Sequence, residues 1–317
     1  MKKSSRKVFL GIELVLLLIL VSFLFLLFRD TEHKKTVAVI VNYSGHEKWN
    51  PVINGMKQAA EEENLHLIIC NTDEIRNAAE ERQLIDEQFN EVDAFLIEPS
   101  PGEQTEGVLE DVRSKKPTLL ISSPSGSIPC VSPDNYNMGV MLAEAIISRF
   151  NGRLDGKTIG LVKGATDIQG ITDREEGFLD GIKNSGAAVS WRVQATYSDT
   201  ETRTIITGQE AVDLMVVLET DALENVGSLS EEKALHGALV FGIGSSEKVL
   251  YDVDEEFIQE VVVPDGFSMG YQAVHMLGET LKYGTKSLRS ETVNARLIRK
   301  EDLFKDENSS FIYSFER

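Results

Sequence analysis

The sequence predicts an α/β fold in which two doubly wound, parallel-sheet lobes follow a single N-terminal transmembrane helix. Three observations support this fold class. An apolar run covers residues 8–28, short apolar segments alternate with amphipathic ones in the rest of the chain, and glycine or proline marks many of the joints. Short, continuously apolar runs are typical of strands buried on both faces of a parallel sheet. Their alternation with helical patterns is typical of doubly wound sheets.

The apolar run at residues 8–28 is long enough to span a membrane. A helix rises about 1.5 Å per residue, so this run would cross a hydrocarbon core of about 30 Å. Four basic residues precede it, which favours a cytoplasmic N-terminus and an extracytoplasmic body. A cleaved secretory signal is the alternative, but its apolar region is usually about 7–15 residues and ends at small residues. We therefore expect a single-pass anchor in the cell membrane, with a short polar linker that ends at residue 35.

Charge and composition exclude several classes of function. Beyond residue 29 the chain has 27 basic and 50 acidic residues, a formal net charge of −23, which opposes binding to nucleic acid. The common hydrolase, zinc-protease and phosphate-loop motifs are missing and the histidines are scattered, so we expect no enzyme activity, no cofactor and no metal site. Cys70 and Cys130 belong to apolar segments, and small buried residues are a better interpretation than a disulfide.

Ten strands are expected after the linker, and they fit two lobes better than one wide sheet. The intervening segments carry apolar residues at helical spacing, most clearly over residues 75–89 and 269–277. The expected strands cover residues 36–42, 65–71, 93–98, 117–122, 157–163, 189–194, 212–218, 238–243, 258–263 and 295–299.

Four stretches, in this order and spacing, carry a resemblance to a known family. They are TVAVIVN at 36–42 with Trp49 and Gly55, Ile97-Glu98-Pro99-Ser100, Arg174-Glu175-Glu176-Gly177-Phe178, and Val262-Val263-Pro264-Asp265 with Gly270. From Thr36 to about Leu303 the chain resembles the ribose- and galactose-type periplasmic sugar-binding proteins, which have the type I periplasmic binding protein fold and are related to the lactose-repressor core.

The resemblance implies two similar lobes joined by a three-crossing hinge that encloses a ligand. Residues 1–35 would hold the cytoplasmic N-terminus, the anchor and the linker. The first lobe would comprise residues 36–133 plus 265–290, the second would comprise 134–262 plus 291–306, and residues 307–317 would form a tail. Asp134, at the first crossing, is expected to cap a helix.

The resemblance also implies candidate ligand-binding residues. Trp49 matches an aromatic residue that lies against the sugar ring, and Arg174 matches an arginine that contacts the sugar. At other matching positions the chain departs from the family, and several carboxylate and amide acceptors are replaced. The candidate set is Trp49, Arg174, His46, Lys48, Ser122, Ser123, Thr220 and Asp221.

The departures support two hypotheses about the ligand. His46, Lys48 and Arg174 would supply positive donors without their usual acidic partners, which suits a sugar acid or a sugar phosphate better than a neutral sugar. Alternatively, the fold has lost ligand binding and acts as a protein-interaction subunit of a sensor kinase system.

The function implied is that of a membrane-anchored, extracytoplasmic solute-binding protein that closes on a small polar ligand. An ABC permease or a sensor histidine kinase is the expected partner. The short linker favours a receptor that works beside a fixed membrane partner.

Overall fold

The computed structural model describes residues 16–23, 34–284, 288–305, 308 and 312. Contacts between Cα atoms divide the chain into two units, Met1–Lys35 and Thr36–Arg317. In the first unit, residues 16–23 are helical and their side chains are exposed. The rest of the anchor expected at 8–28, and most of the tail expected at 307–317, lie outside the described residues. Within the described part of the chain, no helix has the length and apolar character needed to cross a membrane.

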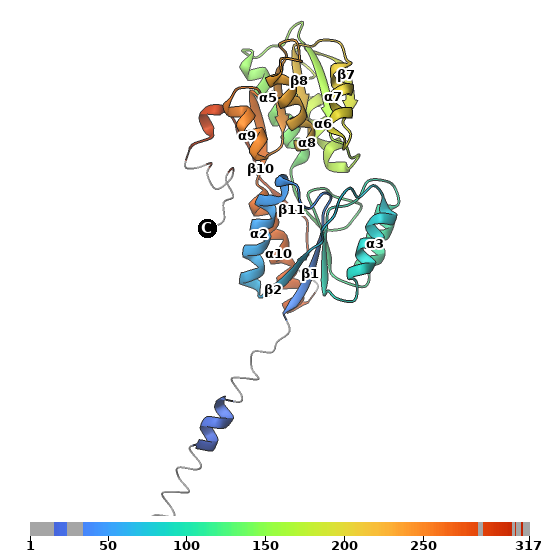
Figure 1. Ribbon diagram of the computed structural model, residues 1–317, viewed down its shortest axis with the longest axis vertical. Coiled ribbons are helices and arrows are strands. Elements are labelled where there is room, and N and C mark those ends of the chain that lie inside the picture. The colour runs from blue at the N-terminus through green and yellow to red at the C-terminus, as the bar shows by residue number, and fades with distance from the viewer. Residues whose placement is uncertain (1–15, 24–33, 285–287, 306–307, 309–311, 313–317) are drawn as a thin grey trace, which may run out of the picture. The chain divides into compact units, whose positions relative to one another are not determined.

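The described part of the second unit contains two six-stranded sheets, one in each lobe (Figure 1). The strand orders are β11-β5-β4-β3-β1-β2 and β12-β10-β9-β8-β6-β7. Strand β12 runs antiparallel to β10, whereas the other ladders described are parallel. The first sheet comprises β1 (Lys35–Ile40), β2 (Leu65–Ile69), β3 (Ala94–Ile97), β4 (Thr118–Ile121), β5 (Cys130–Pro133) and β11 (Glu291–Val293). The second comprises β6 (Thr158–Lys163), β7 (Ala188–Gln194), β8 (Leu214–Val217), β9 (Leu239–Ile243), β10 (Glu260–Pro264) and β12 (Ala295–Ile298).

Helices cover both faces of each sheet. In the first lobe, α2 and α10 pack on one face, and α3 and α4 lie on the other. In the second lobe, α5 and α6 pack on one face, and α7, α8 and α9 on the other. The helices of the first lobe are η1 (Glu47–Trp49), α2 (Asn50–Glu63), α3 (Ala78–Gln88), α4 (Thr105–Arg113) and α10 (Gly266–Tyr283). Those of the second are α5 (Asn135–Arg149), α6 (Gln169–Ile182), α7 (Asp199–Thr207), α8 (Thr220–Glu231), α9 (Glu247–Asp254) and η2 (Lys300–Asp302).

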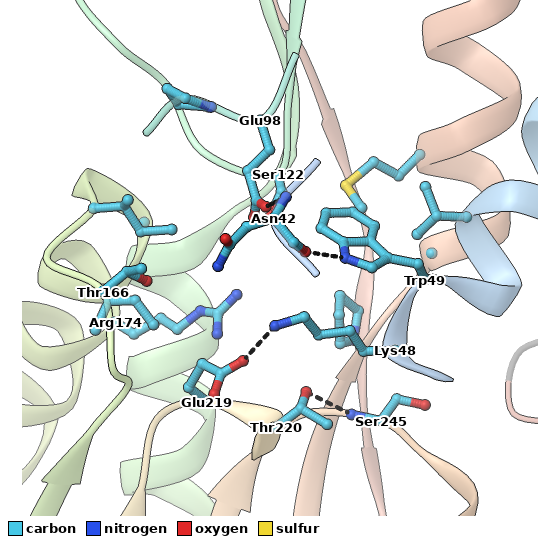
Figure 2. Close-up of a pocket in the computed structure, with 18 of the residues that line it drawn as sticks. Asn42, Lys48, Trp49, Glu98, Ser122, Thr166, Arg174, Glu219, Thr220 and Ser245 are labelled. Carbon is cyan, nitrogen blue, oxygen red and sulfur yellow. Dashed lines mark hydrogen bonds and ion pairs between the residues drawn. The ribbon is translucent and has the colours of Figure 1, made fainter. Parts of the chain in front are cut away.

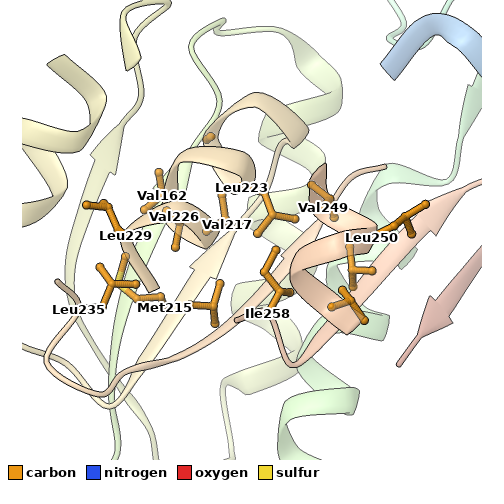
Figure 3. Close-up of a cluster of buried hydrophobic side chains, with 14 of the residues drawn as sticks. Val162, Met215, Val217, Leu223, Val226, Leu229, Leu235, Val249, Leu250 and Ile258 are labelled. Atoms are coloured by element: carbon orange, nitrogen blue, oxygen red, sulfur yellow. The ribbon is translucent and has the colours of Figure 1, made fainter. Parts of the chain in front are cut away.

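Strand β8 shows why the central strands are continuously apolar. Successive strand residues point to opposite faces of a sheet. Met215 and Val217 therefore pack with α8 and α9 on one face (Figure 3), whereas Leu214 and Val216 join the core beneath α5 and α6. All four side chains are buried. The prediction of strands buried on both faces is confirmed.

Each of the ten expected strand segments contains a strand, and two further strands were not predicted. Strand β5 ends in proline, and β11 is a three-residue edge strand with two polar residues, so neither has a strong apolar pattern. Because β11 pairs with β5, it belongs to the first sheet. The third crossing therefore falls at Asn294, between β11 and β12, and not at the start of the segment 291–306 that was assigned to the second lobe.

Each of the first two crossings ends at an aspartate that caps the following helix. The Asp134 carboxylate accepts a hydrogen bond from the backbone N–H of Asn137 (3.0 Å) at the start of α5. At the second crossing, the Asp265 carboxylate accepts one from Ser268 N–H (2.9 Å) at the start of α10. Each aspartate satisfies a backbone donor that the helix leaves unpaired, and the predicted capping role of Asp134 is confirmed.

Both cysteines are buried, free thiols in the core beneath α3 and α4. Burial raises the pKa of both, that of Cys130 to about 12. A thiol held protonated in this way is a poor nucleophile. The interpretation as small buried residues is therefore confirmed.

Candidate functional site

A pocket between the lobes lies where the parallel strands end (Figure 2). It contains about 990 Å³ of empty space, part of which is open to solvent. Open α/β sheets bind ligands at the carboxyl ends of their strands, and the crossings bring those ends of the two sheets together. The lining polar side chains are Asn42, Lys48, Glu98, Ser100 and Ser122 from the first lobe, and Thr166, Arg174, Glu219, Thr220 and Ser245 from the second.

Trp49, which the family resemblance proposed as a ring-contacting residue, forms an aromatic wall of the pocket. Its side chain is 3% exposed and its ring N–H donates to the backbone carbonyl of Asn42 (2.9 Å). This bond satisfies the polar edge of the indole and fixes its orientation. With Val52 and Met269 it gives the pocket an apolar side.

Arg174 reaches the pocket from α6 and is held by the protein on one side. Its Nε donates to Oδ1 of Asn135 and its Nη1 to the carbonyl of Leu218, both at 2.8 Å. These bonds use two of the five N–H donors of the guanidinium group, whose end points into the pocket in Figure 2. Burial lowers the pKa of Arg174, and the nearby carboxylates of Glu219 and Glu98 oppose that shift. Arg174 is therefore a fixed, charged donor inside the site.

Lys48 and His46 reach carboxylates of the opposite lobe. The Lys48 ammonium lies 3.2 Å from Glu219 and 2.9 Å from Asp221, and the His46 ring lies 3.2 Å from Asp221. Burial lowers the pKa of Lys48, but the two carboxylates outweigh it and hold that pKa above its usual range. Lys48 lines the pocket, whereas His46 and Asp221 lie outside its lining.

The remaining predicted residues have three different environments. Ser122 lines the pocket with a left-handed backbone (φ 72°), and its carbonyl accepts from the side-chain amide of Asn135 at 3.5 Å. Ser123 is fully buried outside the pocket, where its hydroxyl accepts from Gly170 N–H at 3.0 Å. Thr220 lines the pocket, and its hydroxyl accepts from Ser245 N–H at 3.3 Å.

The structure places acidic partners in the site that the sequence argument did not expect. Glu98 follows β3, is 9% exposed, and accepts from Asn42 N–H at 3.0 Å. Burial raises its pKa to about 7, although the charge of Lys48 opposes the shift. Glu219 follows β8; burial raises its pKa, but Lys48, Arg174 and the hydrogen bond from Asp221 N–H together outweigh burial and hold that pKa below its usual range. The expectation of positive donors without acidic partners was wrong, because Lys48 pairs with Glu219 and Asp221, and the carboxylates of Glu219 and Glu98 lie near Arg174.

A carboxylate directly after a buried strand is a signal that could have identified both residues. In the sequence, LIEP places Glu98 at the end of one apolar run, and VVLE places Glu219 at the end of another. Because parallel strand ends converge on one edge of a sheet, both were candidates from position alone.

Glu81, on α3, is hydrogen-bonded to the loop that follows Glu98. Its side chain has no exposed surface, and one carboxylate oxygen accepts from Ser100 N–H at 2.7 Å. Among the described residues, its second oxygen is buried without a hydrogen-bond partner. An ionised carboxylate is costly in such a place, and burial raises the pKa of Glu81 to about 7.

We expect Glu81→Gln to raise stability at alkaline pH. A carboxyl group whose pKa is higher in the folded than in the unfolded chain contributes stability below pH 4.5 that is lost as pH rises through 7. Thermal unfolding at pH 5 should differ little from wild type, whereas at pH 8.5 the variant should be more stable by about 2 kcal/mol. Glu87→Gln, an exposed change on the same helix, is the control. Parallel pH profiles for Glu81→Gln and wild type would contradict the burial argument.

Two α/β lobes, three crossings and a polar pocket at the hinge define the class of bilobal binding proteins. The model of the periplasmic binding protein domain matches residues 37–286, and the chain belongs to this family, of the type I periplasmic binding protein fold. A comparison with curated proteins gave no match.

Solved structures share the fold at low sequence identity. A carbohydrate-transporter solute-binding protein from Agrobacterium radiobacter, in complex with D-arabinose, is 18% identical with a TM-score of 0.79 over 89% of this chain and 100% of its own. GanP, a glucose–galactose binding protein from Geobacillus stearothermophilus, is 17% identical with a TM-score of 0.76 over 86% and 100%. A chain in the XylFII–LytSN complex is 14% identical with a TM-score of 0.73 over 85% and 99%.

Proposed function

We propose that this protein binds a neutral sugar or a similar polyhydroxylated molecule between its lobes. The observation that carries the proposal is a pocket with one aromatic wall and buried charged groups of both signs. Arg174 and Lys48 are donors, Glu98 and Glu219 are acceptors, and Trp49 offers an apolar surface. A sugar hydroxyl both donates and accepts, and a sugar ring has an apolar face. Charge-assisted hydrogen bonds to hydroxyls are the stronger kind.

The charge balance of the lining favours a neutral ligand over an anionic one. The formal charges of Lys48 and Arg174 are matched by those of Glu219 and of Glu98 in its ionised form, and Lys48 also pairs with Asp221 outside the lining. A sugar acid or sugar phosphate would bring a further negative charge into a site where both cations already face carboxylates. Burying a charge without a partner is costly. The proposal therefore reverses the preference drawn from the sequence for an anionic sugar derivative.

Neutral sugars are expected to raise the melting temperature of the full-length chain, purified in detergent. Ligand at 100 times its Kd stabilises a protein by about 2.7 kcal/mol. A panel of aldopentoses, aldohexoses and inositol should include a stabilising compound, whereas matched sugar acids and sugar phosphates should have no effect. Stabilisation by the anionic compounds alone would overturn the neutral-ligand proposal. No stabilisation by any compound would favour the degenerate, protein-interaction alternative.

We also propose that residues 8–28 anchor the protein, with its body outside the cytoplasm. Support comes from the length of the apolar run and from the basic residues before it. Ligand binding by the family fold is coupled to closure of its lobes, which changes the surface that both present. An ABC permease or a sensor histidine kinase in the same membrane is the proposed reader of that change. The occurrence of a similar fold in the XylFII–LytSN complex is compatible with a protein partner.

A further inference from the structure

Two side chains before α2, those of His46 and Lys48, contact the second lobe directly. Lys48 forms ion pairs with Asp221 (2.9 Å) and Glu219 (3.2 Å). His46 lies 3.2 Å from the other oxygen of Asp221. Both carboxylates stand at the start of α8 in the second lobe. These contacts join side chain to side chain, so they connect the lobes without a bridging molecule.

The groups are positioned for this contact by their own lobes. Nδ1 of His46 accepts from Lys48 N–H at 3.3 Å, which places a ring hydrogen on Nε2, the atom that faces Asp221. The Glu219 carboxylate accepts from Asp221 N–H at 2.9 Å, which fixes it beside the ammonium. The side chains of Lys48 and Glu219 are only 19% and 14% exposed, so solvent screens their attraction less than it would at the surface.

A second direct contact lies close to the first. The Asn42 side-chain amide donates to the hydroxyl of Tyr197 in the second lobe at 2.8 Å. Ile75 N–H donates to the other end of that amide at 2.7 Å, which holds it in this orientation. The rings of Tyr43 and Tyr197 also meet, with centroids 5.1 Å apart. Together with the buried hydrogen bond from Gly170 N–H of the second lobe to the Ser123 hydroxyl of the first (3.0 Å), these contacts join the lobes directly at several points.

We propose that these contacts form an interlobe latch that keeps the lobes closed before any ligand binds. Its members are Asn42, His46 and Lys48 of the first lobe and Tyr197, Glu219 and Asp221 of the second. Lys48 is the central element, because it contacts two carboxylates of the opposite lobe. A ligand that requires the closed form binds with an apparent Kd equal to its intrinsic Kd divided by the closed fraction. The latch therefore raises the closed fraction and lowers the apparent Kd toward its intrinsic value.

The latch can be tested by measuring the distance between the lobes with no ligand added. Spin labels at Glu87→Cys on α3 and Glu201→Cys on α7, both exposed positions, report the two lobes by electron–electron double resonance. The buried thiols are removed by Cys70→Ala and Cys130→Ala. In the full-length chain we expect one narrow distance population. Lys48→Met should shift at least half of the molecules to a different distance.

Lys57→Met is the matched control, since Lys57 is an exposed lysine on the adjoining helix α2. It should keep the wild-type distance. If Lys48→Met does not fold, Asp221→Asn is judged by the same criterion, because it weakens the ion pair from the other lobe. A wild-type distance distribution in a folded variant of either kind would overturn the latch. No sugar enters the measurement, so this outcome is distinct from a failure of the proposed ligand binding.

Discussion

Replacing Arg174 by methionine is expected to weaken sugar binding about 100-fold. A hydrogen bond to a charged group contributes about 1.5–3 kcal/mol, and about 1.4 kcal/mol corresponds to a tenfold change in Kd. The Arg174 guanidinium is already held by Asn135 and Leu218, so little conformational freedom is lost when a ligand binds it. Calorimetric titration with the sugar that stabilises the protein most in the melting screen would measure the loss.

Two further variants separate binding from folding in this experiment. Arg174→Lys keeps the charge but loses the planar fork, and we expect a smaller loss of about tenfold. Arg153→Met removes an arginine whose side chain is 79% exposed, and it should leave Kd unchanged. Because Arg174→Met also leaves the Asn135 and Leu218 acceptors without their donor, its melting temperature must be measured beside Kd. Wild-type affinity in a folded Arg174→Met protein would remove Arg174 from the site.

Replacing Gly270 by alanine is expected to destabilise the first lobe by more than about 3 kcal/mol. Helices α2 and α10 cross so closely there that an added Cβ would lie 1.9 Å from the carbonyl oxygen of Val52. A Cβ on Gly55, on the facing helix, would lie 2.0 Å from the carbonyl oxygen of Phe267. Neither neighbour is a flexible side chain, so the backbones must separate and the core must lose contacts. Urea unfolding would measure the change in free energy.

The matched control is Gly107→Ala on α4. A Cβ at Gly107 would meet nothing within 4 Å, and the position is exposed within a helix. Alanine stabilises a helix relative to glycine by up to about 1 kcal/mol, so the free energy of unfolding of this variant should rise. Destabilisation by both changes would show that the effect at Gly270 is not caused by the helix crossing. Helices α5 and α6 of the second lobe also cross closely at a glycine, since a Cβ on Gly139 would lie 2.1 Å from the carbonyl oxygen of Arg174.

The strands of this protein were predictable because their environment on both faces is apolar. Val216 and Val217 are typical of this, since one packs beneath α5 and the other beneath α8. The edge strand β11 was not predictable, because Glu291 and Thr292 need no apolar neighbours there. Its place in the first sheet depends on a pairing with β5, which is 160 residues distant along the chain at Glu291↔Val131. Local pattern carries no information about such a partner.

The site was predictable in part. Trp49, Lys48, Arg174, Ser122 and Thr220 line the pocket. Ser123, Asp221 and His46 do not, because the Ser123 hydroxyl accepts a hydrogen bond from Gly170 N–H of the opposite lobe, and Asp221 faces Lys48 and His46 outside the lining. Matching each residue to a family position locates its backbone, but the direction of a side chain depends on the partners around it.

By itself, the sequence determined the alternation of strands and helices, and its resemblance to a known family indicated the bilobal fold and five of the residues that line the pocket. Those features follow from local apolar periodicity and from motifs within short stretches of chain. Only the tertiary structure decided the charge balance of the site, because Lys48 meets Glu219 and Asp221 across more than 170 residues of sequence. The convergence of strand ends from both lobes sets those distances, and charged groups interact according to distance and burial. The proposed ligand preference and the proposed interlobe latch both rest on that convergence.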